Sequence, residues 1–149
     1  MTVTTTALVA TNSVIKVDNA AGTPTDVSGS SNKVQIGPKN GVGEFRAFST
    51  QWKTRVVIGK DTDIKIDFVL SSAADEAYDL FKKWFWGGDD SARTVTIDVP
   101  DSTAGSDRYS GEAVLENLDM PLDAQADQPI FGSAVMKPSG EWTQADISA

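Results

Sequence analysis

Alternation of apolar and polar residues with a period of two is the feature that most constrains how this chain folds. It is clearest in three segments: residues 51–58, 64–70 and 93–99. This period places successive side chains on opposite faces of an extended strand, so each segment is predicted to be a β-strand with one buried face. The turn residues Gly59–Asp61 predict a hairpin between the first two segments. In the first segment, the face expected to be half-buried consists of Trp52, Thr54, Val56 and Ile58.

Further strands are predicted at residues 13–17, 33–36, 109–120 and 129–136. Polar turns at residues 100–107 and 123–128 precede the last two of them, which predicts an antiparallel meander beginning at Arg93. Earlier in the chain, residues 37–50 contain three glycines and a proline. That composition predicts a long loop or a protruding hairpin, which carries Phe45 and Phe48.

One helix is predicted, from about Ser72 to Trp86. Ser72 is a suitable N-cap, Gly87 follows the last helical residue, and Asp79 and Lys83 are spaced to form an ion pair. The apolar face expected to pack inward consists of Ala74, Ala77, Tyr78, Phe81, Trp84 and Phe85.

These elements together predict a mainly β fold, an antiparallel β-sandwich or barrel with one packed α-helix. A chain of 149 residues fits a single domain, residues 1–149. We expect its ends, residues 1–12 and 138–149, to be flexible arms. No stretch approaches the roughly 20 apolar residues of a membrane span, so we expect no membrane partner.

Composition argues against catalysis and against tight nucleic-acid binding. The chain has no histidine and no cysteine, which removes imidazole bases, thiolate nucleophiles and the commonest transition-metal ligands. The carboxylate groups at Asp61–Asp63 and Asp89–Asp90 lack the spacing of a calcium loop. Only a pair of carboxylates for glycoside hydrolysis would remain, and only geometry would reveal it. We therefore predict no enzyme, no cofactor and no metal site.

Charge is distributed unevenly along the chain. The formal net charge is -8. Residues up to Lys83 include ten bases and nine acids, whereas the residues from Trp84 onward include three bases and twelve acids. The asymmetry fits either ordinary solvated faces or a self-complementary surface that favours head-to-tail association.

Several aromatic residues lie outside the predicted apolar faces. Trp86 points away from the buried face of the helix, and Trp142 lies in a polar segment beyond the last strand. Large aromatics in such positions anchor protein interfaces or form a platform for a sugar. A carbohydrate-binding or adhesin module that uses Trp86 and Trp142 is therefore one hypothesis.

The order of the elements also resembles a known family. The segments that carry the resemblance are residues 25–36, Glu44–Ser49, the predicted hairpin 54–68 around Gly59, the helix from Ser72, and residues 108–137. In this order they resemble the major tail proteins, or tail tube proteins, of tailed bacteriophages, particularly those with long non-contractile tails.

The resemblance implies a β-sandwich subunit that forms hexameric rings, which stack into a tube through which DNA leaves the virion without binding specifically. It implies a location in the virion tail after assembly in the host cytoplasm. The implied partners are other copies of the chain, a tape-measure protein, and tail terminator or baseplate proteins. The related tube of a secretion or injection apparatus is an alternative. The candidate subunit-interface residues are Glu44, Phe45, Arg46, Phe48, Trp52, Trp86 and Trp142.

Overall fold

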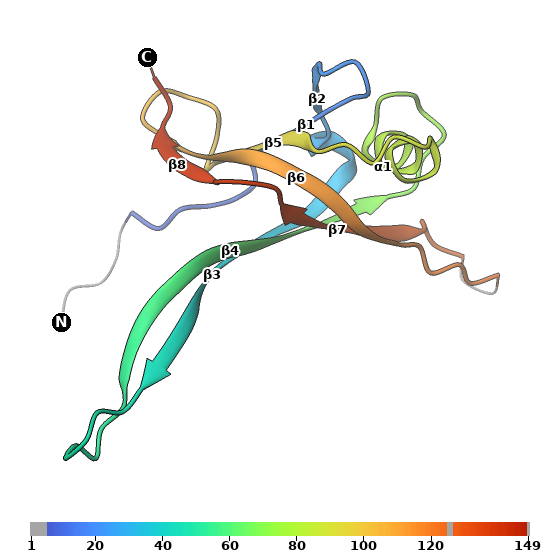
Figure 1. Cartoon of the computed structure of the whole chain (residues 1–149). Coiled ribbons are helices and arrows are strands. Elements are labelled where there is room, and N and C mark those ends of the chain that lie inside the picture. Colours follow the sequence, from blue (N-terminus) through green and yellow to red (C-terminus); the bar gives the residue numbers. More distant parts are fainter. Residues whose placement is uncertain (1–5, 125–126, 149) are drawn as a thin grey trace.

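The computed structural model describes residues 6–124 and 127–148. Within these residues it contains eight β-strands and one α-helix (Figure 1). The strands are β1 (Val14–Asp18), β2 (Pro24–Asp26), β3 (Ser31–Phe45), β4 (Thr54–Val69), β5 (Arg93–Val99), β6 (Asp107–Asp119), β7 (Phe131–Pro138) and β8 (Thr143–Asp146). The helix is α1 (Ala77–Trp86), and a short 3-10 helix, η1, spans Ser28–Ser30. The predicted mainly β fold with one packed helix is thus confirmed.

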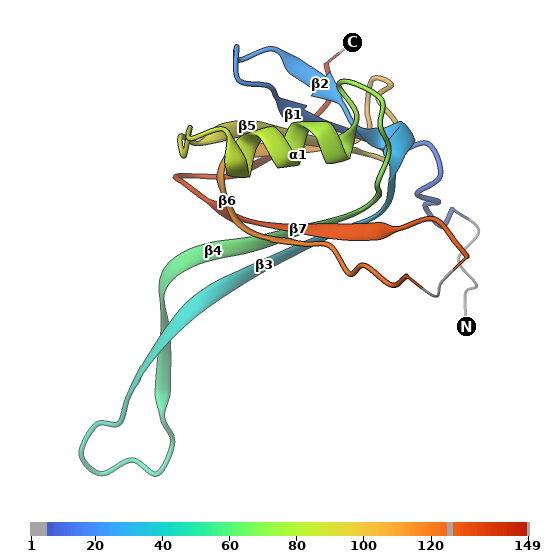
Figure 2. The ribbon, with the colours of Figure 1, turned by 90° about the vertical axis from the view of Figure 1, so that its right-hand side faces the viewer.

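All strand pairs are antiparallel, in the order β2-β1-β5-β6-β7-β4-β3. Strand β6 forms the corner between two layers. Its first part, residues 107–113, pairs with β5, while residues 113–119 pair with β7. Strand β8 pairs with residues 107–110 of β6 on the edge that β7 leaves open. The predicted meander from Arg93 corresponds to β5, β6 and β7, and Figure 2 shows the two layers.

The core lies between the layers, and α1 packs beside it (Figure 2). The alternating side chains of β4, β5 and β7 contribute Ile64, Ile66, Phe68, Val95, Ile97, Ala134 and Met136 to it. From the helix, Phe81 packs against Phe68 with the two rings tilted and their centroids 5.4 Å apart. The guanidinium of Arg93, only 5% exposed, lies 4.8 Å from the ring centroid of Trp84 and fastens the helix to the start of β5.

The predicted hairpin around Gly59 is wrong, because β4 runs without a turn from Thr54 to Val69. Period-two alternation fits one long strand as well as two short ones, and only the pairing partner distinguishes them. That partner is β3, which extends to Phe45 and pairs with β4 along its whole length. Residues 37–45 are therefore strand rather than loop, and the protruding-hairpin interpretation of residues 37–50 is the correct one.

The helix begins later than predicted. Glu76, not Ser72, occupies the N-cap position, and its backbone is extended. The amide N–H of Ala77 donates to Ser30 Oγ at 2.9 Å, so a residue of η1 satisfies the first turn. Phe85, expected in the core, is 44% exposed, whereas the predicted pair of Asp79 and Lys83 is present at 3.0 Å.

The expected C-terminal arm is also wrong for most of its length. Residues 143–146 form β8, and Trp142 lies over Gly111, where a Cβ would come within 2.6 Å of its ring. The Trp142 indole N–H donates to the carbonyl of Glu112 at 2.9 Å. Of the expected N-terminal arm, residues 6–12 are exposed and outside any strand, while residues 1–5 lie outside the described residues. So do residues 125–126 of the predicted turn 123–128 and residue 149 of the expected C-terminal arm.

No helix within residues 6–124 and 127–148 is both long and apolar enough to cross a bilayer.

Candidate assembly interface

Strands β3 and β4 continue beyond the sandwich as a two-stranded projection (Figures 1 and 2). Strand β7 pairs with β4 only from Ile64 to Val69. Before Ile64, β4 pairs with β3 alone among the described strands, from Gly37 opposite Asp63 to Phe45 opposite Thr54. We call residues 37–63 the arm and residues 46–53, which connect its strands, the tip.

The arm carries an unusual amount of exposed apolar surface. At the tip, Phe48 is fully exposed and Trp52 is 86% exposed. Along the strands, apolar side chains are exposed on both faces: Val42, Phe45, Val56, Val57 and Ile58. A two-stranded hairpin is at best marginally stable alone in water, and exposed apolar strands of this kind pair with other chains. The arm therefore needs another surface to cover it.

Two glycines shape the arm around Ile58. The pairing register shifts between Gly41 and Val42, opposite Ile58, as in a β-bulge. A Cβ on Gly41 would lie 3.6 Å from the Ile58 side chain, and one on Gly43 would lie 3.2 Å from it. The absence of side chains at these positions lets Ile58 lie across β3, which flattens one apolar face of the arm.

The charged residues at the outer end of the arm are mostly basic. Glu44 is 3.4 Å from Lys53 Nζ and 3.4 Å from Arg55 Nε. Such exposed ion pairs contribute little to stability. Arg46 forms no ion pair with any residue that the structure describes. Residues 44–55 hold three bases and one acid, so the tip region is positively charged.

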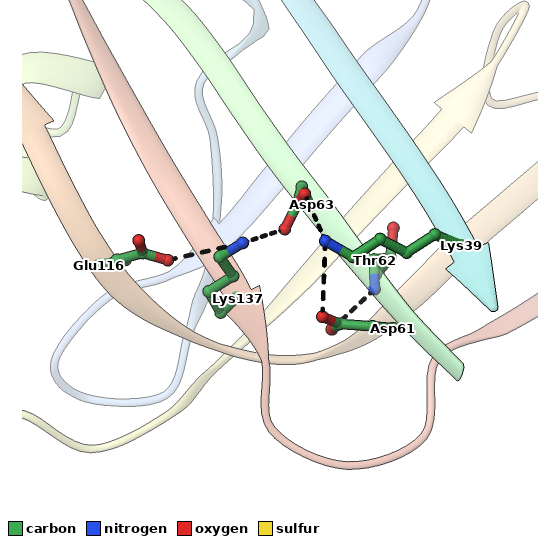
Figure 3. Close-up of polar contacts among 6 residues, drawn as sticks. All are labelled: Lys39, Asp61, Thr62, Asp63, Glu116 and Lys137. Atoms are coloured by element: carbon green, nitrogen blue, oxygen red, sulfur yellow. Dashed lines mark hydrogen bonds and ion pairs between the residues drawn. The ribbon is translucent and has the colours of Figure 1, made fainter. Parts of the chain in front are cut away.

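A row of alternating charges crosses four strands where the arm leaves the sandwich (Figure 3). Lys39 Nζ of β3 lies 3.1 Å from Asp63 and 3.8 Å from Asp61, both on β4. Lys137 of β7 contacts Asp63 on one side and lies 3.7 Å from Glu116 of β6 on the other. The hydrogen bonds from Lys137 and Lys39 lower the pKa of Asp63, and the bond to Asp63 raises the pKa of Lys137.

This row lies on the face of the sheet opposite the core, because Asp63 and Lys137 alternate with the buried Ile64 and Met136. The acids at Asp61–Asp63 were expected at a hairpin tip, whereas they lie within β4 and are held in ion pairs. Thr62 between them points the other way, and its Oγ1 is buried without a hydrogen-bond partner among the described residues.

A second ion pair, absent from the sequence predictions, is buried at the end of β5. The Asp98 side chain is 1% exposed and accepts hydrogen bonds from Arg108 Nε at 2.7 Å and Nη2 at 3.0 Å. Ser102 Oγ donates to it as well, at 2.9 Å. These bonds, chiefly those from Arg108, hold the pKa of Asp98 below its usual range. The pair fixes the connection between β5 and β6.

Five of the seven predicted interface residues lie together at the outer end of the arm: Glu44, Phe45, Arg46, Phe48 and Trp52. The other two lie elsewhere. Trp86 ends α1, is 73% exposed and packs edge-on against Phe85. Trp142 is half-buried and packs on Gly111, so its ring already contacts residues of its own chain. The two tryptophans therefore lie in different settings, one exposed at the end of α1 and the other packed on β6 next to β8.

The apolar strand residues of the arm other than Phe45 were not among the predicted interface residues. Val56, Val57 and Ile58 are consecutive, and such a run breaks the alternation expected of a half-buried strand. This break in the alternation is the sequence feature that could have identified these residues. It indicates a segment with two apolar faces, as in a strand that is covered on both sides only in an assembly.

No protein-family model matches this sequence, and no curated protein sequence matches it significantly. Solved structures do resemble the fold. A chain of the anti-feeding prophage (AFP) baseplate, 6-fold symmetrised, has a TM-score of 0.75 at 11% identity, over 98% of this chain and 100% of that one. A chain of the sheath-tube complex of an extracellular contractile injection system, PVC, gives 0.70 at 10% identity, over 95% and 93%. The SPP1 tail tube gives 0.64 at 12% identity, over 96% and 81%.

These likenesses define the class of fold. The chain has a tail-tube-like fold, which confirms the fold expected from the order of its segments. The same fold occurs in a contractile injection system, so it is shared across more than one kind of tubular particle.

Proposed function

We propose that the chain is a structural subunit that assembles into stacked hexameric rings, which form the tail tube of a phage-like particle. The observation that carries the proposal is the exposed apolar arm, which projects from a tail-tube-like fold and has no covering surface among the described residues. Sixfold symmetry in the AFP baseplate supports six as the ring number.

Ring closure would cover the surfaces that a single copy leaves open. Strand β3 is an edge of the sheet, and its outer side has no partner strand in the described chain. Exposed edges are stabilised when another chain pairs with or covers them. Copies that associate head to tail around a ring close such edges, and rings that stack on one another build a tube. The nearly neutral first part and acidic second part of the chain would favour such contacts.

The polar face of the β3–β4–β7–β6 layer suits the wall of a channel for DNA. The charges in the row of Figure 3 alternate in sign and are paired, so phosphates would meet no unpaired cation in that row. The net charge of -8 also disfavours retention of a polyanion. We infer a conduit through which DNA passes during delivery, with no catalytic residue, in the virion tail after assembly in the host cytoplasm. A tape-measure protein inside the tube and terminator or baseplate proteins at its ends would be its partners.

Electron microscopy of the purified protein tests the proposal. We expect rings or tubes with a central channel to form as the concentration rises. A protein that remained strictly monomeric at high concentration, under several salt conditions, would contradict it.

The tube of an injection apparatus is the second candidate, and its specific support is the likeness to the PVC sheath-tube complex. The two functions differ in cargo and in neighbouring genes. Portal, terminase and tape-measure genes beside this one would support a phage tail, whereas sheath and effector genes without a terminase would support an injection apparatus.

A further inference from the structure

A hollow of about 800 Å³ opens into the interior of the sandwich on the side away from the helix. Helix α1 packs at the Arg93 end of β5, and the hollow lies at the Val99 end, between β3 and the layer of β1, β5 and β6. Ala10 and Thr11 of the N-terminal segment border it, and its larger apolar lining residues are Ile15, Val34, Ile36, Ile97, Val99 and Tyr109. An apolar cavity of about 150 Å³ holds one benzene molecule, so this hollow has room for large side chains. We call it the mouth.

One polar atom in the mouth lacks a hydrogen-bond partner, and two acids lie beside the mouth. Ser13 Oγ lines it, is buried, and has no hydrogen-bond partner among the described residues. Asp107 pairs with Val99 across β5 and β6 and shares a face with Tyr109, which places its carboxylate at the rim. Asp107 also lies directly opposite Asp146 of β8, and like charges in that position are destabilising. Asp107 Oδ1 accepts a hydrogen bond from Gln144 Nε2 at 3.1 Å, but neither acid forms an ion pair within the described residues. The rim is therefore acidic and would be stabilised by a cation.

The tip has the complementary properties. Phe48 and Trp52 are large apolar side chains in water, and Arg46 is a cation without an ion-pair partner in the described chain. Figures 1 and 2 both show the arm pointing away from its own sandwich, so the tip does not reach the mouth of the same copy. The tip is therefore a protruding apolar feature with a base beside it. The mouth is a hollow apolar feature of the same chain with acids beside it.

We propose that the tip of one copy inserts into the mouth of a second copy, with Phe48 and Trp52 against the apolar lining and Arg46 beside Asp107. This inference rests on the proposed function and names the surface that receives the arm. The contact is heterologous, since the tip and the mouth are different surfaces. Each copy has one of each, so such contacts continue from copy to copy and form a ring or a filament rather than a closed dimer.

Cysteine cross-linking tests this contact directly, because the chain contains no cysteine. The test variant combines Gln51→Cys, an exposed tip position beside Trp52, with Val34→Cys in the mouth, so both aromatic side chains of the tip are kept. A disulfide requires that the two Cα atoms come within about 7 Å. The matched control combines Gln51→Cys with Ser72→Cys, an exposed position outside the mouth. Each assembled protein is oxidised and run on a non-reducing gel.

We expect a ladder of covalent dimers, trimers and larger species from the tip and mouth pair. The control pair should give at most dimers joined through two tips. Rings or tubes that form normally but give no ladder would overturn the tip–mouth contact and leave the proposed function intact. Complete failure of the cysteine-free parent to assemble would overturn both. A Leu8→Cys and Val34→Cys variant that cross-links within one copy in assembled particles would show that the N-terminal segment fills the mouth, which also contradicts the contact.

A charge exchange provides an independent readout. Arg46→Glu should weaken assembly, and the combination of Arg46→Glu with Asp107→Arg should restore it. If Asp107→Arg gave no recovery in a folded protein, Arg46 would not lie beside Asp107.

Discussion

Replacement of the aromatic tip should strongly weaken assembly and leave the folded subunit intact. Phe48 is fully exposed and Trp52 is 86% exposed, so the variant Phe48→Ser, Trp52→Ser removes almost no contact from the single copy. In an assembly each ring would be buried, and burial of a large apolar side chain contributes about 1.5–3 kcal/mol. The two together contribute roughly 3–6 kcal/mol per contact, which corresponds to a factor of about 10² to 10⁴ in the association constant.

The assay is sedimentation of assembled protein across a concentration series, with the melting temperature of the unassembled protein measured in parallel. We expect the concentration needed for assembly to rise by about the factor above, with the melting temperature of the single copy unchanged. Leu122→Ser, which removes an apolar side chain that is 73% exposed in the β6–β7 connection, is the matched control and should assemble normally. Normal assembly of the tip variant would refute the role of the tip, and a lowered melting temperature would show that the tip packs within its own copy.

Three further predictions concern the fold. Asp98→Asn should lower the free energy of unfolding by about 1.5–3 kcal/mol in chemical denaturation, because Arg108 loses a charged, buried acceptor. Since the folded-state pKa of Asp98 is lowered, the stability that its carboxylate contributes is complete above the unfolded pKa of about 3.9 and is lost as the pH falls through the folded pKa. The stability of the variant should therefore depend less on acidic pH than that of the parent. Gly111→Ala should cost about 1–3 kcal/mol and shift tryptophan fluorescence, because the added Cβ would meet Trp142 at 2.6 Å; unchanged fluorescence would contradict the packing. Asp63→Asn should cause a small loss of stability that vanishes in high salt, and a large salt-independent loss would show that the ion pairs are not screened by solvent.

The local sequence pattern was sufficient to predict the elements that contact segments close to them in the sequence. The alternation at residues 93–99 predicts β5, and the meander that follows it has short connections. The Asp79 and Lys83 pair follows from helix geometry alone. The tail-tube-like fold followed from the order of such elements, because that order survives where individual boundaries are misplaced.

The errors lie where a residue depends on a distant partner. The start of α1 is set by the hydroxyl of Ser30, which lies 47 residues before Ala77. Trp142 packs where it does because Gly111 has no side chain, a fact that neither segment reveals alone. Strand β4 continues through Gly59 because β3 pairs with it across the whole arm.

Part of the candidate interface could be predicted from the sequence. Aromatics outside the regular apolar faces pointed to Phe45 and Phe48, and the arm brings both to its outer end. The apolar run from Val56 to Ile58 was taken for a half-buried strand, because a single chain offers no second surface that could cover its other face. The mouth could not be predicted from any sequence pattern, because β1, β3, β5 and β6 all contribute residues to it.

End-on image averages of the assembled protein test the central claim most directly. We predict closed rings with six copies around a central channel, in which each arm contacts a neighbouring copy. A single uniform population of monomers, or aggregates without a channel, would contradict the account.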